Sequence, residues 1–183
     1  MARTLGTLPF GTSKMLSLLN IYHPSLISQR FVTGKQREAM EEAGMDFETV
    51  VKTVEDFILN MHTYFVLESL DNLRKNGRLS GVIALVASAL NIKPFMGATD
   101  QGRIIELGQA RGIQKALRSM VEAMAAEVKN PAEKVLGIAH CNNRERAEFV
   151  KEEVKKLLKV KDIIITETNG VSTLYAAQGG IIM

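Results

Sequence analysis

The sequence has few of the residues that build covalent or metal frameworks. It contains one cysteine, three histidines and no tryptophan among 183 residues. A single cysteine excludes an intrachain disulfide framework and fits a reducing compartment. No two of the histidines stand at metal-ligand spacing, and Cys141 only adds a neighbour to His140. We therefore predict no metal site and no cofactor.

An excess of one charge and long apolar runs are also lacking. The chain has 23 basic and 20 acidic residues, a net charge of +3, and only 5% aromatic residues. That balance is too weak to favour nucleic acid as a partner. No uncharged run approaches the roughly 20 residues that span a bilayer. The acid-poor start, in which Glu38 is the first acidic residue, has no apolar core before a cleavage-like site. We expect a cytoplasmic protein.

Sequence motifs for catalysis are missing as well. The chain contains no Gly-x-x-x-x-Gly-Lys-Ser/Thr, no Gly-x-Gly-x-x-Gly and no Gly-x-Ser-x-Gly. His140-Cys141, at the end of an expected strand, is the one place that suggests a nucleophile. Adjacent strand residues point to opposite faces, however, so a structural role is favoured. We predict no catalytic residues and a protein that is not an enzyme.

What the chain does have is the composition of a globular protein, with 46% apolar and 23% charged residues. An apolar stripe at helical spacing after Asp46, the expected N-cap, predicts a core-facing helix. The stripe consists of Phe47, Val50, Val51, Val54, Phe57 and Ile58.

The remaining pattern alternates between strands and helices. Expected strands cover residues 64–67, 95–98, 103–107, 134–140, 162–166 and 179–183, and expected helices cover 81–91 and 113–128. A capping box, Asn142-x-x-Glu145, opens another helix with its apolar stripe at Ala147, Val150, Val154, Leu157 and Leu158. Residues 99–102 form a good hairpin turn. We predict an α/β fold: a mixed sheet that contains an antiparallel hairpin and is covered by helices.

The segment Arg74-Lys-Asn-Gly-Arg-Leu-Ser80 is the most informative part of the chain. Gly77 permits a positive φ, and Ser80 is placed to cap the helix that follows. Arg78 lies between two ordered elements, where a guanidinium suits a carboxylate or phosphate ligand. The alternative is an arginine paired with a surface carboxylate.

This segment resembles the signature of the DegV family of bacterial fatty-acid-binding proteins. The resemblance continues through Leu90-Asn-Ile-Lys-Pro94, Gln109-Ala-Arg-Gly112 and the glycine-rich end from Gly170 to Gly180. It implies that residues 63–183 form the C-terminal α/β domain of the DegV fold. Residues 1–62 would then be a remnant or partial N-terminal domain, and the chain a fragment or truncated member.

The resemblance also implies a function: binding of a long-chain fatty acid in an apolar tunnel and presentation of its carboxylate to a partner acyl kinase, without catalysis. Tyr175 stands where many members have a histidine that meets the lipid carboxylate. The expected ligand-binding residues are Ser80, Ala84, Ala87, Ser88, Tyr175 and Gly179, and the expected partner-docking residues are Arg78 and Arg111.

Other interpretations stay open. The helix expected over 81–91 is apolar on every face, which simple burial explains as well as a lipid tail does. A hydrolase or transferase for a small phosphorylated or carboxylated metabolite would use Arg78 and Arg111 as anion clamps. A truncated interaction module would instead expose apolar surface and self-associate.

Overall fold

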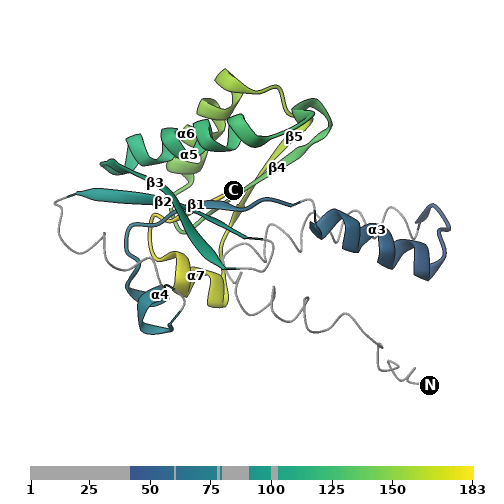
Figure 1. The fold of residues 1–183 in the computed structure, drawn as a ribbon, viewed down its shortest axis with the longest axis horizontal. Coiled ribbons are helices and arrows are strands. Elements are labelled where there is room, and N and C mark those ends of the chain that lie inside the picture. The colour runs from purple at the N-terminus through teal and green to yellow at the C-terminus, as the bar shows by residue number, and fades with distance from the viewer. Residues whose placement is uncertain (1–41, 60, 78, 80–90, 100–102) are drawn as a thin grey trace.

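The fold is given by a computed structural model, which describes residues 42–59, 61–77, 79, 91–99 and 103–183 (Figure 1). Its centre is a six-stranded sheet in the order β3-β2-β1-β6-β4-β5. The strands are β1 (Tyr64–Val66), β2 (Ile92–Ala98), β3 (Ile104–Arg111), β4 (Val135–His140), β5 (Asp162–Glu167) and β6 (Ile181–Ile182). The pair β4–β5 is parallel and the other neighbours are antiparallel. The predicted mixed α/β fold is confirmed.

Helices cover both faces of this sheet. They are α3 (Phe47–Leu59), α4 (Asp71–Lys75), α5 (Ile113–Glu127), α6 (Arg144–Leu157) and α7 (Gly170–Ala176), with a 3-10 turn η1 (Pro131–Glu133). Figure 1 shows α5 and α6 on one side of the sheet, α4 and α7 on the other, and α3 beside it. The sheet therefore has two separately covered faces.

The two-residue period of the strands divides the apolar residues between these faces. In β1, Tyr64 and Val66 belong to the cluster under α5 and α6, while Phe65 belongs to the cluster on the other face. The same alternation separates Ile181 from Ile182 in the central strand β6. Both faces of the middle strands are consequently buried.

The cluster under α5 and α6, called here the long-helix face, is the main core. It contains Tyr64, Val66, Phe95, Ala110, Ala116, Leu117, Met120, Val121, Met124, Ile138, Ala147, Val150, Val154, Ile181 and Met183. The cluster under α4 and α7, called the short-helix face, contains Phe65, Leu67, Leu73, Leu79, Met96, Ala139, Cys141, Tyr175, Ala176 and Ile182.

The start of α6 differs from the prediction by one residue. Asn143, not Asn142, is the N-cap: its side-chain oxygen accepts a hydrogen bond from the backbone N–H of Arg146 at 3.0 Å. Asn142 has a φ of +47° and belongs to the turn before the helix. The capping box predicted on Asn142 and Glu145 is therefore wrong, because the turn takes one residue more than the pattern suggests.

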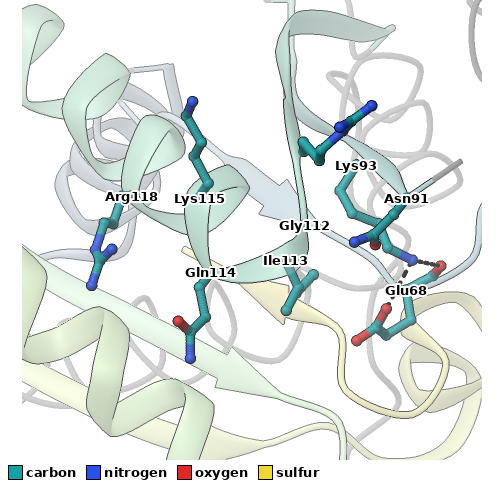
Figure 2. A pocket seen from close by; sticks show the side chains of 9 residues that line it. Glu68, Asn91, Lys93, Gly112, Ile113, Gln114, Lys115 and Arg118 are labelled. Atoms are coloured by element: carbon teal, nitrogen blue, oxygen red, sulfur yellow. Dashed lines mark hydrogen bonds and ion pairs between the residues drawn. The ribbon is translucent and has the colours of Figure 1, made fainter. Parts of the chain in front are cut away.

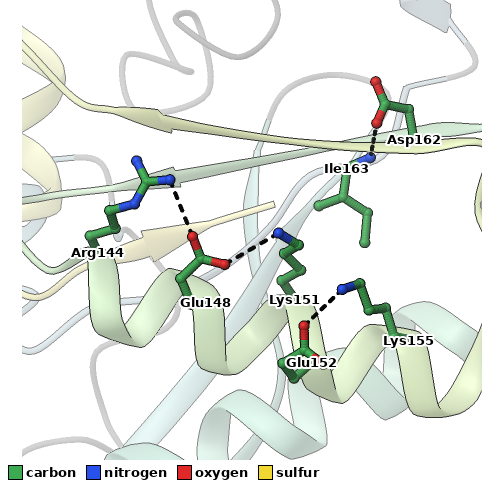
Figure 3. A network of polar contacts seen from close by, with 7 residues as sticks. All are labelled: Arg144, Glu148, Lys151, Glu152, Lys155, Asp162 and Ile163. Carbon is green, nitrogen blue, oxygen red and sulfur yellow. Dashed lines mark hydrogen bonds and ion pairs between the residues drawn. The ribbon is translucent and has the colours of Figure 1, made fainter.

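The predicted apolar stripe of α6 is correct over most of its length. Ala147, Val150 and Val154 are fully buried, whereas Leu157 is 51% exposed because the helix ends there. The opposite side of α6 carries ion pairs at helical spacing, such as Arg144–Glu148 at 3.2 Å and Lys155–Glu152 at 2.8 Å (Figure 3). These pairs are exposed and contribute little to stability.

The β2–β3 hairpin is longer than predicted. We expected strands over 95–98 and 103–107, but β2 already begins at Ile92 and β3 runs to Arg111. Pro94 is tolerated because β1 pairs only with the far end of β2, at Met96 and Gly97.

The helix α3 fits its prediction in part. Asp46 is the N-cap, since its carboxylate accepts a hydrogen bond from the backbone N–H of Thr49 at 3.0 Å. Val50 is buried, but Phe47 is 67% and Val51 37% exposed. The core-facing stripe is wrong at these two positions because α3 lies beside the sheet (Figure 1). The side chains of 54–59 lie outside the description.

Candidate functional site

Five of the predicted site residues fall outside the described part of the chain. These are Arg78, Ser80, Ala84, Ala87 and Ser88. The apolar helix expected over 81–91 lies there too, except for Asn91. Their proposed contacts with a ligand or partner stay predictions.

The turn that leads into this segment has the predicted geometry. Gly77 follows α4 with a φ of +68°, and its N–H donates to the carbonyl oxygen of Arg74 at 3.0 Å. This left-handed conformation favours glycine, as expected from the Asn76-Gly77 pair.

A cleft of about 620 Å³ opens beside the start of α5. It is lined by Glu68, Asn91, Lys93, Arg111, Gly112, Ile113, Gln114, Lys115 and Arg118 (Figure 2). Arg111 is the last residue of β3, and α5 begins two residues later, so the predicted strand-to-helix junction is confirmed. The structure therefore places Arg111 at a cleft rather than on a flat surface.

The lining of this cleft is strongly basic. Lys93, Arg111, Lys115 and Arg118 face a single acidic residue, Glu68. The N-cap of α5, Gly112, has no side chain to cap the helix, so the positive end of the helix dipole adds to the charge. Figure 2 shows Lys115 and Arg118 on the α5 side and Lys93 with Glu68 on the other. The cleft suits an anionic group.

The basic residues differ in how strongly they are held. Arg118 forms an ion pair with Glu153 at 3.4 Å, and its guanidinium lies 5.3 Å from the ring centre of Phe149. Within the described part of the chain, Arg111 and Lys115 form no ion pair. These two exposed side chains therefore carry positive charges that no acidic side chain of the described residues neutralises.

Among the described residues, Glu68 is the one acidic residue that lines the cleft. Its two carboxylate oxygens accept from Lys93 at 2.9 Å and from Arg146 at 2.8 Å. Lys93 also donates to the backbone carbonyl of Glu68 at 2.8 Å. Burial raises the pKa of Glu68, but the hydrogen bonds from Lys93 and Arg146 outweigh it and hold that pKa below its usual value.

Arg146 extends this network to the turn between α7 and β6. One of its guanidinium nitrogens donates to Glu68 and another donates to the carbonyl oxygen of Gly179. Gly179 has a φ of +83° and is buried. The carbonyl oxygen of Gly179 thus has a partner within the protein. The predicted contact of Gly179 with a ligand stays a prediction.

Tyr175, the other predicted ligand residue at this end, lies on the short-helix face. It is 8% exposed and packs in the cluster with Cys141 and Ala176. Arg111 lines the cleft and Tyr175 does not. The Glu68–Arg146–Gly179 chain of contacts connects the cleft to the turn that follows α7.

Glu68 and Lys93, which line the cleft, and Arg146, which binds Glu68, were not predicted as site residues. One signal was available: Arg146 is the third residue of α6, where the helix dipole disfavours a cation. A residue that breaks a local rule often has a tertiary partner. The identity of that partner, 78 residues earlier in the chain, has no local signature.

His140 and Cys141 have separate surroundings, as predicted. His140 accepts at Nδ1 from the backbone N–H of Asn143 at 3.3 Å, at the start of α6. Cys141 belongs to the short-helix cluster and lies 4.0 Å from the carbonyl oxygen of Thr173. Both are buried. Their contacts are those of structural residues.

No group of three or more His, Cys, Asp or Glu side chains is arranged to hold a metal ion in the described part of the chain. None of its helices is long and apolar enough to cross a membrane.

Comparison with known proteins gives consistent matches. The family model described as "Uncharacterised protein, DegV family" matches residues 29–182. A DegV domain-containing protein of Streptococcus pyogenes serotype M1 is 35% identical over 146 residues, which is 80% of this chain and 51% of the relative.

Solved structures agree. A DegV-family protein from Ruminococcus gnavus, described with vaccenic acid, has 51% identity and a TM-score of 0.78 over 82% of this chain and 53% of its own. The Streptococcus pneumoniae fatty acid kinase B3 protein, described as loaded with linoleic acid, has 29% identity and a TM-score of 0.68, with 82% and 53% covered. The chain spans about half the length of the curated relatives it matches. It belongs to the DegV family.

Proposed function

We propose that the protein binds a long-chain fatty acid and takes part in presenting its carboxylate to an acyl kinase, without performing catalysis itself. The observation that carries the proposal is the Ruminococcus gnavus relative, which is 51% identical and is described with vaccenic acid. Two proteins that are 51% identical share more of the residues around a ligand than two proteins that share only a fold.

The short-helix face supports an apolar ligand. It holds a buried apolar cluster, yet its two covering helices have only 5 and 7 residues. Tyr175 belongs to this cluster, and Gly179 follows α7 in the sequence. The residues proposed for the acyl tail follow α4 in the sequence and are Ala84, Ala87 and Ser88. Burial of an acyl chain against such a face contributes about 0.8 kcal/mol per methylene.

Affinity as a function of chain length tests this directly. The delipidated 183-residue protein is titrated with tetradecanoic and hexadecanoic acid, and bound acyl chains are checked by native mass spectrometry. Two additional methylenes are expected to tighten binding by about tenfold. A pocket for a small phosphorylated or carboxylated metabolite would give no dependence on chain length. Absence of any acyl binding would refute the proposal.

The basic cleft is proposed as the docking site for the kinase. Arg111 and Lys115 are exposed cations at its mouth, and such charges guide association with an acidic partner surface. The pneumococcal relative, described as a fatty acid kinase B3 protein, motivates the choice of partner. Arg78 is proposed for the same role.

A charge reversal separates docking from lipid binding. Arg111→Glu is expected to reduce kinase-dependent phosphorylation of the bound fatty acid by about tenfold or more, with the fatty-acid affinity unchanged. Arg103→Glu is the matched control, because this exposed arginine precedes β3 at the end away from the cleft. Equal activity of the two variants would remove Arg111 from the docking site.

A further inference from the structure

The contacts of Glu68 reach in two directions. On one side its carboxylate and its backbone carbonyl hold Lys93, and both residues line the cleft. On the other side the same carboxylate holds Arg146, which bonds the carbonyl oxygen of Gly179. One acidic residue thus touches the cleft and, through one guanidinium, the turn that joins α7 to β6.

Arg146 occupies a position that a helix ordinarily gives to an acidic residue. It is the third residue of α6, at the positive end of the helix dipole. Its side chain is only 17% exposed, so its charge depends on Glu68 and on the Gly179 carbonyl. A lysine would be a poorer substitute, because its charge is one point at the end of a flexible stem, whereas two separate guanidinium nitrogens of Arg146 bind the carboxylate and the carbonyl oxygen.

Gly179 fits this arrangement and no side chain would. A Cβ added to Gly179 would lie 2.7 Å from Nη1 of Arg146 and 3.2 Å from Cγ of Glu68. The N–H of Gly179 donates to the carbonyl of Cys141 at 2.8 Å, and the N–H of Gly180 donates to the carbonyl of Ala177 at 3.1 Å. The turn is therefore held by backbone bonds on one side and by Arg146 on the other.

We propose that Glu68 is a positioning residue: through Arg146 it fixes the Gly179 turn, and so sets the place of the fatty-acid head group beside Tyr175. The inference rests on the proposed function, since it assigns the head group to this turn. Lys93 holds Glu68 from the cleft side, so the network also joins the proposed docking site to the ligand site.

The test compares a fatty acid with an alcohol of the same length. Glu68→Gln removes the carboxylate charge and Arg146→Lys removes the planar guanidinium. Glu122→Gln is the matched control because Glu122 is exposed on α5 and unpaired among the described residues. Binding of hexadecanoic acid should weaken about tenfold in both test variants, while binding of hexadecanol changes less than about twofold. The control should bind both as the parent does.

The outcomes are distinct. Unchanged acid binding in folded Glu68→Gln and Arg146→Lys proteins, or equal weakening of acid and alcohol, would overturn the inference. If the parent binds neither ligand, the proposed function fails, and hydrogen exchange decides the positioning role by itself. Faster exchange of the Gly179 and Gly180 amides in Glu68→Gln, with other amides unaffected, supports it, and unchanged exchange overturns it.

Discussion

The two faces of the sheet are covered by very different helices. On the long-helix face α5 and α6 have 15 and 14 residues, and they bury a continuous apolar cluster. On the short-helix face α4 and α7 have 5 and 7 residues. Helices this short gain little stability by themselves and depend on tertiary contacts. One such contact is the hydrogen bond from the side chain of Asn72 to the carbonyl oxygen of Leu174, at 2.5 Å.

Polar groups are distributed unevenly as well. Thr168 and Ser172 are buried near α7, and the hydroxyl of Thr173 donates to that of Thr168 at 3.1 Å. On the other face, Tyr64 donates to Glu127 at 2.5 Å at the end of α5. Burial and this hydrogen bond raise the pKa of Tyr64 well above its usual value. The long-helix face holds the larger buried cluster and is the main core, and the short-helix face is the one proposed for the ligand.

The largest expected effect is the loss of packing on the long-helix face. Leu117→Ala removes a fully buried side chain and should lower the free energy of unfolding by about 3 kcal/mol, measured by urea denaturation. The control on the short-helix face is Leu174→Ala, which removes a 56% exposed side chain and should cost less than about 0.5 kcal/mol. Similar costs would mean that the loss of stability does not follow the burial of the side chain.

The glycines after α4 and after α7 test whether the Arg146 contact matters. Both have a positive φ, so alanine at either position costs about 1 kcal/mol in backbone strain. At Gly77 no described atom lies within 4 Å of an added Cβ. Gly179→Ala must in addition displace Arg146 from its partners and should cost about 1 kcal/mol more than Gly77→Ala. Thermal unfolding of both variants gives the difference, and equal costs would contradict the role of Arg146.

Helix caps give a smaller contrast. The side chain of Asn143 caps α6, whereas Asn169, the N-cap of α7, forms no side-chain cap bond. Asn143→Ala should therefore cost about 1 kcal/mol of unfolding free energy. Asn169→Ala should cost markedly less, as measured by the same denaturation experiment. A larger loss of stability for Asn169→Ala than for Asn143→Ala would contradict the assignment of the side-chain cap to Asn143.

Much of the fold could be predicted because its signals are local. The helix predicted over 113–128, which Asn130-Pro131 ends, agrees with α5 to within one residue. The capping aspartate of α3 and the positive φ of Gly77 were also predicted from neighbouring residues. The errors arose where tertiary context overrides local pattern. Pro94 is a strand residue because β1 leaves that part of β2 unpaired, and α7 formed where the sequence suggested only a glycine-rich end.

The site was less predictable for the same reason. Arg111 was found because a strand-to-helix junction has a sequence signature. Glu68 and Arg146 are 78 positions apart, and the sequence around either residue gives no signal that identifies its partner. Gly179 was predicted as a place where the backbone approaches a ligand. That ligand contact stays a prediction, and the structure adds that a Cβ at Gly179 would meet the Arg146 side chain, which no single-sequence pattern would reveal.

The smallest expected effect concerns pH and the Glu68 network. The pKa of Glu68 in the folded protein lies below its ordinary value of 4.5, so the unfolded chain takes up the proton first as the pH falls. The stabilisation is fully present above pH 4.5 and is lost as the pH falls through the folded-state pKa. Since the carboxylate is 35% exposed, solvent screening limits it to less than about 1 kcal/mol.

Glutamine at this position does not titrate, so Glu68→Gln removes this contribution to the pH dependence. Denaturation between pH 6 and pH 3.5 should show that the parent loses more stability on acidification than Glu68→Gln does. Glu122→Gln should follow the parent, because Glu122 has no ion pair among the described residues. Parallel curves for the parent and Glu68→Gln would mean that Lys93 and Arg146 do not favour the ionised carboxylate.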